Sequence, residues 1–299
     1  MDRVQLESDW RVSVPGLPTG LGLPTGVGLT ALCTAGERGA ESRRPDRLFE
    51  DRGAQALMEV VGRTPRTPGP PDGRLPKSRA LAVDFVALRT RFFDDELRAA
   101  SARCGQVVLL GSGLDSRAFR LDWARDTVVY ELDRRDVLLF KHGIVARSGQ
   151  EPRCTRVEVG ADLRGDWPGA LRAAGFNPWR PTVWGVEELL PYFDRAENDR
   201  LLSRITAMSA AGSRLVADHF DEALQRSVRF SAMTEVRGAV GAVWRSALEV
   251  PDGWLVPHGW TCGLTNPVEL AGRSGREVPD LFTSSAESAG HLWLMSAVR

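Results

Sequence analysis

From residue 106 onward, short apolar runs alternate with longer amphipathic segments, and this alternation limits the possible folds more than any other feature. Runs of five or six residues rich in Val and Leu suit strands that are buried on both faces. Amphipathic segments between such runs are typical of helices that cover a parallel sheet. The predicted strands span residues 106–111, 127–132, 155–159, 182–186 and 214–218. The sequence therefore predicts an α/β fold with an open, doubly wound sheet.

Two helices and two further strands can also be predicted with definite limits. A buried helical stripe is formed by Leu81, Phe85, Leu88 and Phe92, which recur at spacings of four, three and four. A second helix begins near Asp194, which can form a capping box with Glu197, and this helix ends at Gly212. Residues 260–265 and 291–298 read as an additional pair of strands, joined by a Pro/Gly-rich connection, at the C-terminal end of the sheet.

The first 78 residues form a separate region, which precedes a main domain over residues 79–299. Gly and Pro are dense at 15–28 and at 62–76, and they oppose helix and strand, so we predict a flexible arm and a mobile loop. The helices predicted at 29–40 and 45–62 are too small to fold alone. We therefore expect residues 1–78 to supply a flexible arm and a helical lid over the main domain.

Composition excludes several classes of function. The 299 residues carry 39 basic and 39 acidic side chains, which is unlike the basic footprint of a nucleic-acid-binding protein. No apolar run reaches the ~18 residues that a membrane helix needs. The four cysteines are scattered without a CxxC pair, so neither a metal site nor a disulfide framework is expected. The first ten residues lack the apolar core of a secretory signal, and we expect a cytoplasmic protein.

Glycine and acidic residues follow four of the predicted strands at the edge where ligands of open α/β sheets bind. Asp133 lies 22 residues after Gly111, a spacing at which a carboxylate meets ribose hydroxyls. Each feature is weak alone, because a glycine turn or an acidic cap occurs in many folds. In chain order the set comprises Gly111, Gly113 and Asp115, then Asp133, then Asp162 and Leu163, then Glu187 and Glu188. Their joint occurrence predicts an adenosine-containing ligand.

The glycine turn favours one adenosine ligand over another. A dinucleotide site needs a third glycine, where this chain has Ser116, and the carboxylate of Asp115 would repel a pyrophosphate. The same carboxylate suits a ligand that carries an ammonium or a sulfonium group. No phosphate-binding GxxxxGK[ST] motif is present. The pattern thus favours S-adenosylmethionine, and an NAD(P)-dependent oxidoreductase stays open as the alternative from another class.

Several longer words of the sequence resemble the leucine carboxyl methyltransferase family, and most of all its bacterial branch, which includes polyketide carboxyl O-methyltransferases. The most specific words are RTRFFDD and GLDSRAFRL, and the likeness spans roughly residues 28–299. Other matching stretches are GLTALCTAGERGAESRRPDRLFED, VVYELD, DLRGDWPGALRAAGF and EELLPYFDRAENDRLLSRI. The resemblance implies a class I methyltransferase fold, which is Rossmann-like, and S-adenosylmethionine as the methyl donor.

The resemblance also implies roles for individual residues. Arg89 would grip the carboxylate of the methionine moiety, Asp133 would bind the ribose, and Asp162 with Leu163 would contact the adenine. Gly111 and Glu187 fall on further cofactor-binding positions. This chain departs from the family pattern at Glu188, where a glycine is usual, and at Asp51-Arg52, where Asp-Pro is usual. A carboxylate at Glu188 would repel an anionic methyl acceptor, so we expect Glu188 to face the substrate.

Two residues near the strand ends could act on the methyl acceptor. Tyr192 follows the fourth strand and could position the acceptor oxygen, and His219 ends the fifth strand and could serve as a base. Equally, either side chain could have only a structural role. A carboxylate acceptor is ionised at pH 7 and needs no base, whereas a phenol or alcohol needs one.

The leading hypothesis is an O-methyltransferase that acts on a carboxyl group of a small, secondary-metabolite or polyketide-like acceptor. Methylation of a hydroxyl or phenol, methylation of a protein C-terminal carboxylate, and a reaction other than methyl transfer on the same fold stay open.

Overall fold

The computed structural model describes residues 27–61, 77–239, 243–282 and 290–299. The arm expected at 15–28 therefore lies almost wholly outside the described residues, and the loop expected at 62–76 lies wholly outside them. Among the described residues, no helix is long and apolar enough to cross a membrane.

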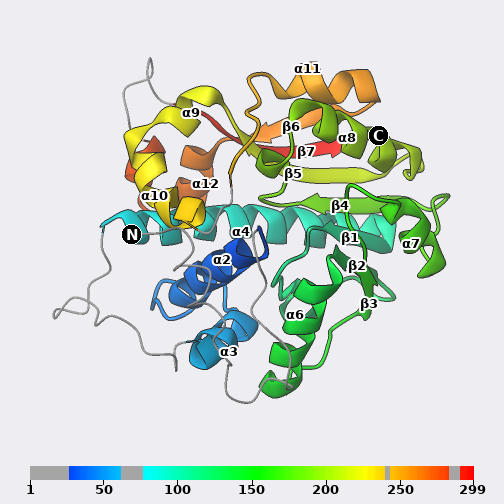
Figure 1. Cartoon of the computed structure of the whole chain (residues 1–299), viewed down its shortest axis with the longest axis horizontal. Coiled ribbons are helices and arrows are strands. Elements are labelled where there is room, and N and C mark those ends of the chain that lie inside the picture. Colours follow the sequence, from blue (N-terminus) through cyan, green and yellow to red (C-terminus); the bar gives the residue numbers. More distant parts are fainter. Residues whose placement is uncertain (1–26, 62–76, 240–242, 283–289) are drawn as a thin grey trace.

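A single seven-stranded sheet forms the centre of the molecule, with the strand order β3-β2-β1-β4-β5-β7-β6. The first five strands are parallel to one another, and β7 pairs antiparallel with both β5 and β6. Their bounds are β1 Gln106–Leu110, β2 Val128–Asp133, β3 Thr155–Gly160, β4 Thr182–Val186, β5 Arg214–Phe220, β6 Thr261–Thr265 and β7 Leu292–Val298. Each strand ends within two residues of its prediction, so the predicted α/β sheet with a C-terminal antiparallel pair is confirmed. Figure 1 shows the strands stacked from β6 near the top to β3 near the bottom.

Helices cover both faces of this sheet, and their bounds complete the fold. The α-helices are α2 Val27–Glu41, α3 Arg52–Val61, α4 Lys77–Cys104, α5 Arg117–Arg120, α6 Arg135–Ser148, α7 Trp167–Ala173, α8 Arg195–Ala207, α9 Glu222–Arg226, α10 Val228–Ala239, α11 Pro251–Leu255 and α12 Pro267–Arg273. Short 3-10 turns are η1 Leu190–Tyr192, η2 Val256–His258 and η3 Asp280–Phe282.

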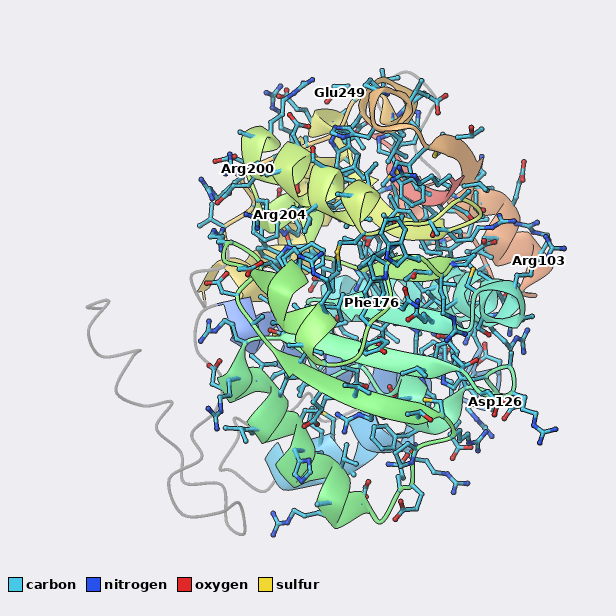
Figure 2. All side chains as sticks on the ribbon, turned by 90° about the vertical axis from the view of Figure 1, so that its right-hand side faces the viewer. Arg103, Asp126, Phe176, Arg200, Arg204 and Glu249 are labelled. Carbon is cyan, nitrogen blue, oxygen red and sulfur yellow. The ribbon has the colours of Figure 1, made fainter. Side chains whose placement is uncertain are left out.

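Alternating side chains along each strand separate two hydrophobic cores. Trp184 and Leu215 face the layer of α7, α8 and α11, where they pack with Phe176 inside the molecule (Figure 2). Val183 and Val216 face the opposite layer, which contains α4, α10 and α12. Burial of a side chain of this size stabilises the fold by ~2–3 kcal/mol. The side-chain period of two therefore decides which layer each strand residue reaches.

Two predicted helices differ from the structure in their limits. The helix expected at 45–62 begins only at Arg52, because the buried carboxylate of Asp51 accepts the backbone N–H of Ala54 and caps α3. The helix predicted to end at Gly212 ends at Ala207, although its capping box of Asp194 and Glu197 is confirmed. The connection between β6 and β7 contains the helix α12, which starts with a proline in its first turn.

The N-terminal helices lie against the body of the molecule next to the sheet. Figure 1 shows α2 and α3 below α4 and beside α6, and all three of α2, α3 and α6 share a small apolar core around Phe140. Arg38 of α2 fixes this arrangement, because its guanidinium donates to Asp51 at 2.8 Å and to the backbone carbonyl of Leu114 at 2.7 Å. Helix α2 is thereby held against the loop that follows β1.

Candidate active site

A cavity of about 380 Å³ lies where the parallel strands end, and one of its walls is formed by α2. Nearly all residues predicted for the site line this cavity: Arg89, Gly111, Gly113, Asp115, Asp133, Asp162, Leu163, Glu187, Glu188 and Tyr192. His219 is the predicted site residue that does not. The residues that follow β1, β2, β3 and β4 meet in one place because parallel strands bring their carboxyl ends to the same edge of the sheet. Arg89 reaches the same place from α4.

The glycine turn after β1 needs glycine for both backbone and space. Gly111 has φ +63 and Gly113 has φ +47, which is the left-handed region that other residues rarely adopt. A Cβ atom on Gly111 would also stand 2.9 Å from Leu189 Cδ1, and one on Gly113 would stand 3.1 Å from Ala31 Cβ. The turn therefore allows its backbone to border the cavity directly.

Asp133 closes the glycine turn from the end of β2. Its Oδ2 accepts the backbone N–H of Gly113 at 2.7 Å, and its Oδ1 accepts that of Arg134 at 2.7 Å. Burial raises the pKa of this carboxyl, while the two backbone N–H groups oppose the rise. Each carboxylate oxygen has a second lone pair, so Asp133 can accept further hydrogen bonds from a ligand with hydroxyl groups. Asp162, which accepts the N–H of Arg164, and the half-buried Leu163 border the same cavity.

Arg89 reaches the cavity from α4 with a side chain that is only 2% exposed. Its Nε donates to Glu187 Oε1 at 3.2 Å, and its Nη2 donates to Glu188 Oε2 at 2.5 Å. A third carboxylate, Asp218 of β5, lies 3.8 Å from Nη1. One guanidinium therefore stands among three carboxylates.

Arg117 holds a second group of carboxylates beside the first. Its Nε donates to Asp94 at 2.7 Å, while its Nη1 donates to Asp115 at 2.5 Å and to Glu187 at 2.6 Å. Asp115 is thus paired with a guanidinium of the protein itself. Neighbouring cations hold the pKa of its carboxyl well below the usual range, although burial acts in the opposite direction. Glu187 bridges Arg89 and Arg117 and joins the two groups.

Negative charge exceeds positive charge in this network. Together with Arg120, which binds Asp94, three guanidinium groups meet five carboxylates. Burial, reinforced by the nearby Glu187 and Glu188, raises the pKa of Asp218 to about 7. The cavity itself is lined by five guanidinium groups and five carboxylates, and a lining of both signs fits a ligand that carries a carboxylate together with ammonium and sulfonium groups. The donor set thus suits S-adenosylmethionine, as the glycine turn predicted.

His219 lies apart from this cavity, contrary to the expectation that it could reach the methyl acceptor there. It is the neighbour of Asp218 on β5, so the two side chains point to opposite faces of the sheet. His219 lines a separate hollow with Ser246 and Trp254. Its Nδ1 accepts the backbone N–H of Phe220 at 2.8 Å, which places the proton of the neutral ring on Nε2, 3.3 Å from Ser246 Oγ. Burial lowers the pKa of His219 to about 4.

Tyr192 and Glu188 occupy the part of the cavity that follows β4. Tyr192 is 6% exposed at the end of η1, so its ring borders the cavity while most of it packs into the protein. Glu188 has φ +49, a conformation that costs about 1–2 kcal/mol for a residue other than glycine. The Glu188 carboxylate also accepts a hydrogen bond from Thr34 Oγ1 of α2 at 2.9 Å. Roles for both residues toward an acceptor stay predictions.

Five residues of the network or in contact with it were not predicted from the sequence, namely Thr34, Asp94, Arg117, Arg120 and Asp218. Arg117 belongs to the word GLDSRAFRL, and its place directly after the glycine turn was a usable signal. Asp218 precedes His219 in the same strand, and the alternation of strand side chains could have indicated that only one of them faces α4. Thr34 contacts Glu188 across 154 residues of sequence, for which no local pattern exists.

Comparisons with known proteins agree with this geometry. A family model described as leucine carboxyl methyltransferase matches residues 31–206. A protein of Parafrankia sp. named "Putative S-adenosyl-L-methionine-dependent methyltransferase" is 41% identical over 84% of this chain and 82% of its own length. A protein of Streptomyces avermitilis with the same description is 41% identical over 90% of this chain and 94% of its own.

Solved structures show the same fold at low sequence identity. A crystal structure described as a putative methyltransferase from Thermobifida fusca has a TM-score of 0.50 and 19% identity, and it covers 75% of this chain and 84% of that one. A DUF574 family protein from Streptomyces avermitilis has a TM-score of 0.51 and 14% identity, with 75% and 89% covered.

Proposed function

Because the chain belongs to the leucine carboxyl methyltransferase family and is an S-adenosylmethionine-dependent methyltransferase, we propose that it methylates an oxygen atom of a small-molecule acceptor. A carboxyl group is the leading target. The single observation that carries this proposal is the cavity in which acidic and glycine-rich strand ends meet beside two buried guanidinium groups. The carboxyl group as target is supported by the family to which the chain belongs and by the position of His219 outside the cavity.

We assign the cofactor-binding residues on the basis of charge and position. Arg89 binds the carboxylate of the methionine moiety, because a guanidinium can donate two parallel hydrogen bonds to a carboxylate. Asp133 accepts the ribose hydroxyls, and Asp162 with Leu163 contacts the adenine. Glu187 and Asp115 supply negative charge near the ammonium and sulfonium groups, and Gly111 with Gly113 lets the backbone approach the ligand.

Methyl transfer in this cavity depends on positioning rather than on proton removal. The bound cofactor supplies a methyl group on a positively charged sulfur. The protein aligns an acceptor oxygen with that methyl group, and such alignment can account for several kcal/mol of the barrier. Tyr192 borders the cavity where it can orient the oxygen. His219 is not available as a base, since its Nε2 carries the proton and its ring faces another hollow. A carboxylate acceptor needs no base.

A hydroxyl or phenol acceptor is the second candidate, and Glu188 favours it. A carboxylate at the wall of the cavity repels an anionic acceptor by about 1 kcal/mol at contact in water, and by more when partly buried. The family to which the chain belongs supports the carboxyl group more strongly, so we keep that group as the leading target.

The N-terminal helices complete the proposal as a lid. Helix α2 borders the cavity with Thr30, Ala31 and Thr34, and a segment of this size gains its order from packing onto the main domain. We propose that residues 27–61 cover the bound cofactor and that the acceptor enters beneath them.

An acceptor screen tests the function. The full chain is incubated with S-adenosylmethionine and matched sets of carboxylic acids and phenols, and release of S-adenosylhomocysteine is measured together with the mass gain of one methyl group on the acceptor. We expect turnover with carboxylic acids that is lost in Asp133→Ala. Turnover with phenols alone would replace the leading target by the second candidate, and product formation without release of S-adenosylhomocysteine would refute the assignment.

A further inference from the structure

Glu188 has a backbone conformation that a glycine would adopt without strain. Its φ of +49 lies in the left-handed region, and among the described residues only Asp126 is another non-glycine residue with positive φ. Asp126 lies in the exposed turn before β2, at the edge of the molecule (Figure 2). Glu188, in contrast, lines the active-site cavity. Strain that persists at a functional site indicates that the side chain itself has a role there.

The side chain of Glu188 connects the lid helix to the arginine of the cofactor site. Its Oε2 accepts from Arg89 Nη2 at 2.5 Å and from Thr34 Oγ1 at 2.9 Å. Its backbone N–H donates to Asp218 Oδ1 at 2.7 Å, which fixes the strained residue above β5. The carboxylate is therefore directed at Arg89 by contacts on two sides.

An incoming carboxylate meets a guanidinium of which two neighbouring nitrogen atoms, Nε and Nη2, already donate to protein carboxylates. A two-bond fork needs two adjacent N–H groups of Arg89, and Nε and Nη2 donate to Glu187 and Glu188. A fourth carboxylate in this place would also be repelled by the three already there. The carboxylate of Glu187 or of Glu188 must move away before the carboxylate of a ligand can bind to Nε and Nη2 of Arg89.

Of the three carboxylates around Arg89, that of Glu188 can move away most easily. Glu187 is held by a second guanidinium, since Arg117 Nη1 donates to it at 2.6 Å. Asp218 is 4% exposed and belongs to a central strand of the sheet. Glu188 follows β4 at the cavity wall, and moving its side chain away from Arg89 leaves the hydroxyl of Thr34 as a neighbouring donor.

We propose that Glu188 is an internal competitor of the cofactor, whose carboxylate exchanges with the Glu188 carboxylate at Arg89. This inference rests on the proposed function, because it takes Arg89 as the group that binds the methionine carboxylate. S-adenosylhomocysteine carries the same carboxylate, so Glu188 weakens binding of the product as well and speeds its release. A glycine in this position would relieve the strained backbone and abolish the competition.

Calorimetric titration of two ligands tests the exchange without measuring turnover. S-adenosylhomocysteine carries the carboxylate, whereas 5′-methylthioadenosine has the same nucleoside and sulfur but lacks the amino-acid portion. Glu188→Gln removes the charge and keeps the shape of the side chain. We expect this variant to bind S-adenosylhomocysteine about tenfold more tightly and 5′-methylthioadenosine with the affinity of the wild type.

Two further variants show whether the tighter binding arises at Arg89. Glu96→Gln is the matched control, because Glu96 lies on α4 like Arg89 and accepts a hydrogen bond from the hydroxyl of Ser296, yet it does not line the cavity. We expect it to change neither affinity. In an Arg89→Ala background, Glu188→Gln should no longer tighten binding of S-adenosylhomocysteine.

The possible outcomes separate this inference from the proposed function. Unchanged or weaker binding of S-adenosylhomocysteine by Glu188→Gln would overturn the competition while the proposed function stands, and so would equal effects on both ligands. If the wild type bound neither ligand, or if Arg89→Ala left the affinity for S-adenosylhomocysteine unchanged, the cofactor assignment itself would fail and the inference with it.

Discussion

Lowering the pH should destabilise the folded protein through His219, and replacing this residue should remove that effect. The His219 side chain is 2% exposed and is neutral in the fold, because its Nδ1 accepts the N–H of Phe220 and its Nε2 faces the hydroxyl of Ser246. The same hydroxyl donates to the backbone carbonyl of Leu190 and accepts from Asn198. A proton on Nδ1 would break the hydrogen bond with the N–H of Phe220 and would place a positive charge on the buried ring.

The size of the effect follows from the pKa of His219, which burial lowers from 6.5 to about 4. As the pH falls from 6.5 to 4, the unfolded chain takes up a proton at this residue that the folded protein does not. The stability that the neutral ring contributes is therefore complete above pH 6.5 and is lost below it. The loss is about 2 kcal/mol at pH 5 and about 3 kcal/mol below pH 4.

Urea unfolding of the wild type and of His219→Gln measures this contribution. The variant has no group that titrates here, so the stability advantage of the wild type should shrink by about 2 kcal/mol between about pH 7.5 and pH 5. The comparison cancels the other titrating groups, which both proteins share. A difference between the two proteins that does not depend on pH would refute the reasoning. A loss of methyl transfer of about 100-fold or more in a folded His219→Gln protein would instead indicate a catalytic base.

Two other predictions concern the cofactor site and the lid. Asp133→Ala should weaken binding of S-adenosylmethionine by about 100-fold, since hydrogen bonds to a charged acceptor contribute ~1.5–3 kcal/mol each. Asp133→Asn keeps an oxygen for the N–H of Gly113 and should lose less affinity. Calorimetry measures both affinities, and the assignment would be contradicted if the two variants bound the cofactor like the wild type. Arg38→Ala should cost about 3 kcal/mol, because it leaves the buried carboxylate of Asp51 without its guanidinium. Hydrogen exchange should then become faster across residues 27–61, and unchanged protection there would mean that Arg38 does not hold the lid.

Local pattern was sufficient to predict the sheet and several of the residues that line the cavity at its edge. Buried strands such as Thr182–Val186 are short apolar runs between amphipathic segments, so their positions can be read from the sequence. The turn at Gly111 and Gly113 needs positive φ, and Asp194 with Glu197 forms a capping box within four residues. In each case the decisive interaction joins residues that are close in sequence or repeat with the period of the element.

Contacts across the chain could not be predicted in this way, and they decide the chemistry of the site. Arg89 meets Glu187 and Glu188 across about a hundred residues, and Asp115 shares Arg117 with Glu187. The sequence determined that these charged groups exist and that strands carry most of them to one edge of the sheet. Only the tertiary structure decided which carboxylate faces which guanidinium, and that His219 turns away while Asp218 turns inward. The physical reason is that ion pairing depends on distance in space and on burial, which local sequence pattern does not encode.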